Sequence, residues 1–379
     1  MNCGDWNGVS NDKPITTMPR VLSWVQSDQI LNRVQAEYEE LLFNSLGYLL
    51  GKLIKSRDAS ATEIKALVDG LNEVSLRRVI TAPEASYRLF YWCHQTKEVA
   101  SFIQTSLAAE NYRATNKSSV PENVQWTALG EPCIKTHDQE RSQACYLLRG
   151  YAPIDLDSPY ALNLSLVDGE HSRSKQSPFP YKGVVRATAL QHVHSAGELI
   201  NTISPYADTL VLSFTKVLVL RCDPNNLKGF ASSSSGHFTG RSMLINPHTE
   251  DAAGATVTNG IVHEAIHSIL YMIEKKCPWL SADHLYFDDS ARVNSPWTGA
   301  SLLLRPFLQA CFVWYGLVNF WSHTTALAVL PKSEVLSMAT RAYAGFANGP
   351  LVDCLNPWRN RIDKDVLDTI DAMQSAVRR

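Results

Sequence analysis

The sequence predicts an α+β protein that is mainly α-helical, with a helical N-terminal region and a mixed C-terminal core in which a small sheet lies beside a buried helix. Three observations favour this class. Apolar residues recur with helical spacing through most of residues 20–112. A run of β-branched and apolar residues at 210–220 is typical of a buried strand. Residues 256–275 again show helical periodicity, with apolar residues on most sides of the expected helix.

The N-terminal half divides into three parts by composition. Residues 1–19 are expected to form a flexible leader, and residues 20–112 a helical region. Residues 113–184, rich in Asn, Ser, Pro and Gly, are expected to be a connecting region with short strands. Within these parts the pattern predicts helices at 21–55, 60–74 and 83–103, and strands at 144–149 and 160–167. Pro83 fits the first turn of its helix, where a missing N–H is tolerated.

Residues 185–379 are expected to form the metal-binding catalytic core. The pattern there predicts a helix at 192–203, a buried strand at 210–220, a serine-rich loop at 232–236, an edge strand at 242–245, and helices at 256–275, 299–323, 331–346 and 362–377. The expected edge strand lies beside the expected helix at 256–275, which carries the informative motif.

Composition excludes several classes of protein. The chain has 379 residues, 45% of them hydrophobic and 19% charged, and a formal net charge of −2, as in ordinary folded proteins. There is neither the basic excess typical of nucleic-acid binding nor the acidic excess typical of disorder, so no nucleic-acid partner is expected. The longest apolar stretch, at 301–321, is interrupted by Arg305, Pro306, Gln309 and Asn319, so no membrane span is expected.

Two features indicate a cytoplasmic protein. The first residues lack a basic segment followed by an apolar stretch, so we expect no secretory signal. The eight cysteines are scattered without a Cys-x-x-Cys pair, which is typical of reduced thiols and makes a structural zinc site unexpected.

The most informative segment is His-Glu-Ala-Ile-His at 263–267, a His-Glu-x-x-His motif. Residues four apart lie on one face of a helix, so His263 and His267 can offer two imidazoles to one metal ion. Glu264 projects roughly 100° further round the helix and can serve as an acid/base group or orient a ligand. In metallopeptidases this Glu is the general base. A pair of core histidines is the alternative, but a polar triplet on an otherwise apolar helix needs a partner.

The third metal ligand stays open at this level. A catalytic zinc site has three protein ligands, and a non-haem iron site commonly has two His and a carboxylate. Asp288, which lies 25 residues after His263, is our candidate, because some metallopeptidases place their third ligand at such a separation. The competing candidates are Asp289, His284, Glu274 and His323.

Arg305 is a candidate for binding an anion. Arg305 and Pro306 open a long aromatic-rich helix, where a cation opposes the helix dipole. A bidentate carboxylate is the natural partner of a guanidinium beside a buried cleft.

Taken in order, these features resemble the His-Glu-x-x-His peptide-modification proteins of ribosomal-peptide biosynthetic clusters. The resemblance spans roughly residues 20–330 and is firmer after residue 185. Its most specific parts are the metal motif and the stretch from Ser-Pro-Trp at 295–297 to Arg-Pro at 305–306. The other segments that contribute are Leu-Arg-Arg-Val-Ile-Thr-Ala-Pro-Glu at 76–84 and Gly-Arg-Ser-Met-Leu-Ile-Asn at 240–246.

Some members of this family are α-ketoglutarate-dependent peptide β-hydroxylases. The resemblance therefore implies that His263 and His267 hold Fe(II), that Arg305 pairs with a carboxylate of α-ketoglutarate, and that the substrate is a ribosomally made precursor peptide. The sequence departs from the family at Phe312, where relatives often have a His seven residues after Arg-Pro; Gln309 lies one turn earlier.

Two other functions stay open. A zinc metallopeptidase would use Glu264 as general base, although the His-x-x-Gly-x-x-His extension of one peptidase class is absent. The third hypothesis is a non-catalytic relative that binds a peptide or a partner enzyme. It is motivated by Phe312, which stands where relatives often have a His.

Overall fold

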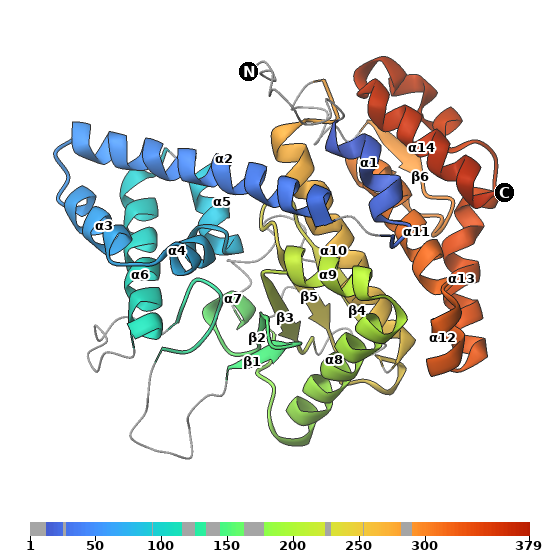
Figure 1. Ribbon diagram of the computed structural model, residues 1–379, viewed down its shortest axis with the longest axis horizontal. Coiled ribbons are helices and arrows are strands. Elements are labelled where there is room, and N and C mark those ends of the chain that lie inside the picture. The colour runs from blue at the N-terminus through green and yellow to red at the C-terminus, as the bar shows by residue number, and fades with distance from the viewer. Residues whose placement is uncertain are drawn as a thin grey trace. The chain divides into compact units, whose positions relative to one another are not determined.

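The computed structural model describes residues 13–25, 28–92, 94–115, 126–133, 145–162, 178–223, 229–252, 254–281 and 290–379 (Figure 1). The α-helices are α1 (Pro14–Val21), α2 (Asp28–Lys55), α3 (Ser60–Asp69), α4 (Glu73–Ile80), α5 (Pro83–Tyr91), α6 (Thr96–Thr115), α7 (Pro159–Leu162), α8 (Gly183–Ile203), α9 (Pro205–Phe214), α10 (Ala255–Lys276), α11 (Leu304–Trp321), α12 (Thr324–Val329), α13 (Lys332–Ala347) and α14 (Lys364–Val377). The 3-10 helices are η4 (Glu250–Ala252) and η6 (Leu351–Arg361). The strands are β1 (Tyr146–Leu148), β2 (Ala152–Asp155), β3 (Val217–Arg221), β4 (Ala231–Ser234), β5 (Arg241–Ile245), β6 (Arg292–Asn294) and β7 (Ser301–Leu303). The protein is α+β and mainly helical, as the sequence predicts.

The chain divides into two compact units. The terminal unit combines Met1–Val34 with Ile273–Arg379, and the sheet unit is Gln35–Met272. The four segments expected from the sequence remain a prediction, because each unit combines parts of several of them.

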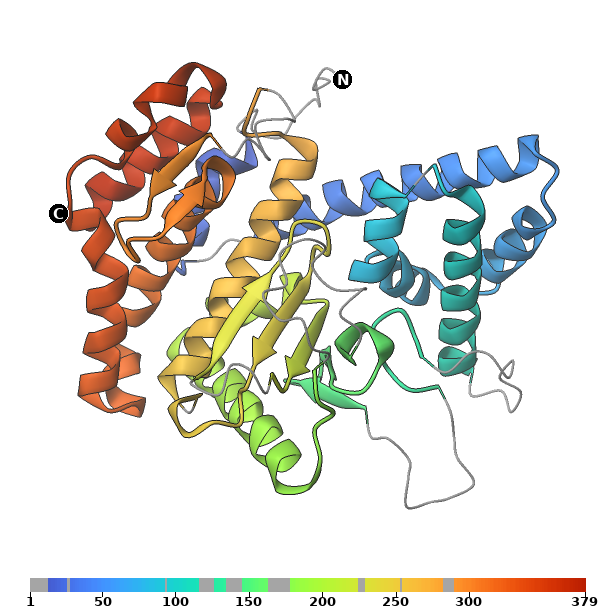
Figure 2. The same ribbon diagram turned by 180° about the vertical axis from the view of Figure 1, so that it is seen from behind.

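The sheet unit is built on a five-stranded mixed sheet in the order β1-β2-β3-β5-β4. The three inner strands are parallel, and the outer strands β1 and β4 are antiparallel to their neighbours. All five residues of β3 are buried, as expected for a central strand of apolar composition. Helices α8 and α9 lie in front of the sheet in Figure 1 and behind it in Figure 2. Because β4 is last in the strand order, it forms one edge of the sheet.

The prediction of a strand at 210–220 is correct only in its second half. Residues 210–214 belong to helix α9, and the strand β3 begins at Val217. The helix start is encoded locally: Ser204 accepts a hydrogen bond at its hydroxyl from the N–H of Ala207, 3.3 Å away, and Pro205 occupies the first helical turn. The cap and the proline outweigh the β-branched composition that follows them.

The predicted loop at 232–236 and edge strand at 242–245 are both wrong in detail. The serines form strand β4, which pairs with β5 so that Ser233 lies opposite Met243. Consequently β5 is an inner strand, flanked by β3 and β4, and the serine strand occupies the edge. Serine has little intrinsic preference for strands, so the long-range pairing decides this segment.

In the connecting region, the strand predicted at 144–149 is confirmed as β1. The strand predicted at 160–167 is wrong for residues 160–162, which belong to helix α7; residues 163–167 lie outside the described part of the chain. The hydroxyl of Ser158 accepts a hydrogen bond from the N–H of Tyr160 at 3.0 Å, which favours a helix start over a strand. Strand β2 was not predicted.

The terminal unit joins the two ends of the chain. The expected leader is wrong for residues 14–19, which form helix α1 with Ile15 and Met18 buried. Lys13, just before α1, forms an ion pair of 2.7 Å with Asp363, the cap of α14. The helix predicted at 299–323 begins later, at Leu304, because residues 301–303 form β7 and pair with β6. The helices predicted at 331–346 and 362–377 are confirmed as α13 and α14.

Several of the N-terminal helices predicted as single segments are pairs. The helix predicted at 21–55 is confirmed from Asp28 on as α2, and Val21 is the last residue of α1. The helix predicted at 60–74 is confirmed as α3 up to Asp69 and is followed by the start of α4, and that at 83–103 is divided between α5 and α6. Within the described residues, no helix combines enough length with enough apolar character to cross a membrane.

Candidate metal centre

Helix α10 carries the His-Glu-x-x-His motif over the range that the sequence predicts. Its apolar residues pack on several sides, and the side chains of Ile261, Val262, Ala265, Ile266, Ile269 and Leu270 have no exposed surface. The burial explains the helix: packing of an almost wholly apolar surface stabilises it far more than helix propensity does. The polar motif is therefore held on a rigid, buried element.

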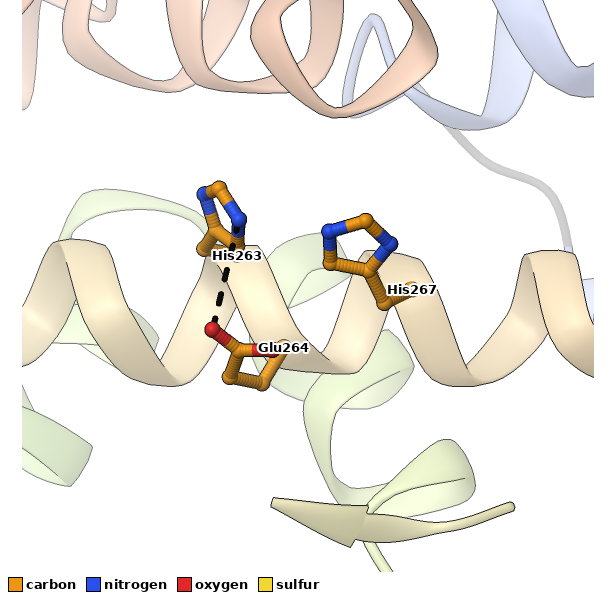
Figure 3. A group of neighbouring side chains, drawn as sticks. All are labelled: His263, Glu264 and His267. Atoms are coloured by element: carbon orange, nitrogen blue, oxygen red, sulfur yellow. Dashed lines mark ion pairs between the residues drawn. The ribbon is translucent and has the colours of Figure 1, made fainter. Parts of the chain in front are cut away.

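The two histidines of α10 face the same way. Figure 3 shows both imidazoles on one side of the helix, with Glu264 pointing to another side. Their ring centroids are 5.0 Å apart, and the ring planes are inclined by 58°. The Nε2 atom of His263 lies 4.0 Å from the Oε1 atom of Glu264. One ligand atom each from His263, Glu264 and His267 lie within 4.8 Å of one another.

The residues present fit a divalent metal ion. Two imidazole nitrogens and a nearby carboxylate are the donor types that zinc and non-haem iron prefer. Donors that bind one such ion at about 2.1 Å in tetrahedral geometry lie roughly 3.4 Å apart. Side-chain rotations would therefore have to bring the ligand atoms, which lie within 4.8 Å of one another, closer together around an ion. Both histidines are partly exposed, whereas Glu264 is 2% exposed, so the imidazoles are the accessible part of the group.

The carboxylate of Glu264 is fixed by two serines of the edge strand. The hydroxyl of Ser232 donates to Oε1, and that of Ser234 donates to Oε2, each at 2.6 Å. Residues two apart on a strand point to the same face, so β4 presents both hydroxyls to α10 together. The two bonds hold the carboxylate in one orientation, and neither donor is charged.

Gly260 allows this approach of the strand to the helix. A Cβ atom at Gly260 would lie 2.7 Å from the ring of Phe230 and 3.3 Å from Cβ of Ser232. Gly260 is one turn before Glu264, on the same face of α10. The glycine therefore makes the close contact that brings Ser232 and Ser234 within hydrogen-bond distance of Glu264.

Sequence reasoning did not identify these two serines, because it placed them in a loop. One signal in the sequence points to them: the glycine within an apolar helix, which often marks close backbone packing.

Tyr271 lies beside His267. Its ring stacks on that of His267, with centroids 5.7 Å apart and planes inclined by 16°. The stacking restricts rotation of the His267 ring and favours one direction for its nitrogens.

The candidate third ligands have different outcomes. Asp288, our candidate, lies outside the described residues, as do Asp289 and His284. His323 is exposed and occupies the N-cap position of helix α12, with its Nδ1 atom 3.1 Å from the hydroxyl of Thr325. Within the described part of the chain, the only compact group of three candidate ligands is that of His263, Glu264 and His267. The third ligand stays a prediction.

In the terminal unit, Arg305 and Glu274 form an ion pair. Both Nε and Nη2 of Arg305 contact Oε2 of Glu274, at 2.8 and 2.7 Å. The amide of Gln309 donates to the same oxygen at 2.7 Å. Arg305 thus has a carboxylate partner, as its chemistry predicts, but the carboxylate belongs to the chain itself. The expected role of Arg305 toward α-ketoglutarate remains a prediction. Gln309 is hydrogen-bonded to Glu274.

The two other segments of interest pack in the core of the terminal unit. Phe312 has no exposed surface and packs on Trp279, with ring centroids 5.3 Å apart. Trp297, of Ser-Pro-Trp, stacks on Trp314 at 5.9 Å and donates its indole N–H to the carbonyl of Ala342 at 2.9 Å. In these contacts both residues serve packing.

No protein-family model matches the chain, and no curated protein is significantly similar to it.

Proposed function

We propose that this chain is a metal-dependent enzyme that modifies a peptide. The observation that carries the proposal is the convergence of His263, His267 and Glu264 on one buried helix, with ligand atoms within 4.8 Å. Two accessible imidazoles one helical turn apart, beside a buried and oriented carboxylate, are an arrangement that a metal ion or an acid/base reaction can use. The resemblance to peptide-modification proteins supports the peptide as substrate, and a ribosomally made precursor peptide is the partner we propose.

For the chemistry, we propose β-hydroxylation with Fe(II) and α-ketoglutarate. The resemblance supports this choice, and the pair of imidazoles supports the iron. Bound Fe(II) would supply the activation of O₂: one oxygen atom enters a C–H bond of the peptide as a hydroxyl, the other enters succinate, and CO₂ leaves α-ketoglutarate. The two electrons that each substrate gives up account for the four that O₂ accepts.

The chain's own residues would divide the work. His263 and His267 bind the ion and fix its position relative to the helix. Glu264, oriented by Ser232 and Ser234, accepts and returns a proton at a carboxylate oxygen or orients a ligand. Arg305 would pair with a carboxylate of α-ketoglutarate, as the resemblance implies.

A zinc peptidase is the second candidate, and the geometry of Glu264 favours it. The carboxylate lies 4.0 Å from Nε2 of His263 and is held in one orientation, as a general base beside a metal requires. Under this alternative, Arg305 keeps Glu274 as its partner and no second substrate is needed. A non-catalytic relative that binds a peptide or a partner enzyme is the third candidate.

Reconstitution tests the three candidates together. Metal-free protein is mixed anaerobically with Fe(II) and α-ketoglutarate and then exposed to O₂ with candidate precursor peptides. We expect a weak visible charge-transfer band, followed by the release of succinate and a peptide heavier by one oxygen atom. The His267→Ala variant should lose the band and both products, and the His323→Ala variant should keep them. Zinc-restored peptide cleavage without succinate identifies the peptidase. A protein that binds neither metal fits only the non-catalytic candidate.

A further inference from the structure

A second site lies in the sheet unit, at a cavity of about 260 Å³. Its walls come from α2, α4, the turn between β1 and β2, and the junction between α9 and β3, and they include Glu39, Arg77, Arg78, Thr215 and Lys216. None of these residues belongs to the metal motif. The volume is near the lower limit for pockets that bind small molecules.

The cations of the cavity wall differ in how their charges are balanced. Arg77 is paired with Glu39 at 3.3 Å and with Glu73 at 2.6 Å. Arg78 is paired with Glu110 and Glu131. In the described part of the chain, no carboxylate lies within ion-pair distance of Lys216, whose ammonium donates to the carbonyl of Ser213 at 3.0 Å. Lys216 is therefore the cavity-wall cation without an ion pair in the described part of the chain, and Glu39, in the same wall, acts on it only from beyond ion-pair distance.

The side chain of Lys216 is held in place. Gly240, with a φ of +90°, accepts a hydrogen bond from the N–H of Lys216 at 2.8 Å. A Cβ atom at Gly240 would lie 2.7 Å from Cγ of Lys216, so the lysine stem packs where only a glycine leaves room. The inner part of the lysine side chain is thus confined, and the ammonium is held by its hydrogen bond to the carbonyl of Ser213. Burial lowers the pKa of Lys216, and the charge of Glu39 opposes this only in part.

The neighbouring residue adds a buried hydroxyl without a hydrogen-bond partner among the described residues. Thr215 lines the cavity, is 1% exposed, and its hydroxyl has no hydrogen-bond partner among the described residues. Buried hydroxyls in native proteins nearly always have a partner, from the protein, from water or from a ligand. A positive charge and a hydroxyl on adjacent residues are the donors that an oxygen anion accepts from.

We propose that this cavity is a binding site for a small oxyanion, a carboxylate or a phosphate, which Lys216 and Thr215 hold. The anion would balance the charge of Lys216 and accept from the Thr215 hydroxyl. The site is separate from the metal motif and is independent of the reaction proposed for it.

Calorimetric titration of the full-length protein tests this site. The probes are inorganic phosphate and succinate, each compared with sodium chloride at equal ionic strength. The titrations are repeated in the His267→Ala variant, because a metal ion also binds these anions. We expect at least one probe to bind equally well in both proteins. Which probe binds identifies the class of the ligand.

Matched variants locate the binding. Lys216→Met should weaken it at least about tenfold, and Thr215→Val about threefold to tenfold, because charged hydrogen bonds contribute more than neutral ones. Lys216→Arg should bind better than Lys216→Met, and Lys65→Met, at an exposed lysine of α3, should change nothing. Circular dichroism confirms that each variant folds. Absence of binding by both probes, or equal binding by Lys216→Met, overturns the proposal.

Discussion

Helix α10 carries two buried glutamates ten residues apart, and their partners differ in kind. Glu264, in the sheet unit, accepts one hydroxyl on each carboxylate oxygen, from Ser232 and Ser234. Glu274, in the terminal unit, receives Arg305 and Gln309 on Oε2 alone. The first carboxylate has only neutral donors in these contacts, whereas the second has its charge balanced by a guanidinium. A carboxylate oriented by neutral donors is available to a metal ion or a proton, whereas one paired with arginine is suited to holding elements together.

The contrast between Glu264 as a functional carboxylate and Glu274 as a structural one would not hold if the histidines beside Glu264 bound no metal. We expect His263→Ala and His267→Ala each to lose nearly all bound metal, because a single imidazole is a weak site. Elemental analysis of protein purified without chelators measures this. The exposed His323→Ala variant is the control and should keep its metal. Full occupancy in the His263 and His267 variants would show that the motif is structural.

The two glutamates should differ most in catalysis. Glu264→Gln should lower turnover by about 10²- to 10⁴-fold while metal content stays the same, because the amide cannot take up the proton. Glu274→Gln should leave metal content unchanged and act mainly on stability. Succinate release or peptide cleavage, whichever the reconstitution reveals, measures the rate. Normal turnover of Glu264→Gln contradicts an acid/base role.

A third buried carboxylate extends the comparison to pH. Asp155 is 3% exposed and accepts from the N–H groups of Asp157 and Ser158 and from the Ser158 hydroxyl, all neutral donors. Burial raises the pKa of Asp155 to about 7. The folded state therefore binds this proton more tightly than the unfolded state, whose pKa is about 3.9.

The contribution of Asp155 to the free energy of unfolding should consequently fall as the pH rises from about 4 to about 7, and stay constant above. The total change should be about 2–4 kcal/mol. Urea unfolding of the native protein and of Asp155→Asn across this range isolates the effect, since the variant lacks this titration. Parallel pH profiles for the two proteins would contradict the raised pKa.

For the ion pair, Arg305→Met tests the stabilising role. The substitution leaves the charge of Glu274 buried without its guanidinium, and we expect a loss of about 2–3 kcal/mol in the free energy of unfolding. The partial exposure of Arg305, 22% of its side chain, keeps this below the loss at a fully buried pair. Urea unfolding measures the loss, with the exposed Arg359→Met as the control. A change no greater than that of the control would show that the pair contributes little.

The smallest effect concerns the serines that orient Glu264. Ser232→Ala and Ser234→Ala should each destabilise the fold by about 1–2 kcal/mol, because each leaves a buried carboxylate oxygen without its donor. Ser233→Ala is a matched control, since this serine lies on the other face of the same strand. A double-mutant cycle with Glu264→Gln should show coupling for Ser232 and Ser234 and none for Ser233. Equal effects at all three serines would contradict the assigned hydrogen bonds.

By itself, the sequence determined the α+β class and the helix that carries the His-Glu-x-x-His motif. It also placed His263 and His267 on one face of that helix, because residues four apart lie one turn from each other. It also indicated that Arg305 needs a carboxylate. The tertiary structure decided which carboxylate that is, turned a run of serines into the edge strand, and placed Ser232 and Ser234 on Glu264. These partners are separated by 30 to 32 residues along the chain. Local periodicity carries no information about such pairings, because they depend on how distant elements pack.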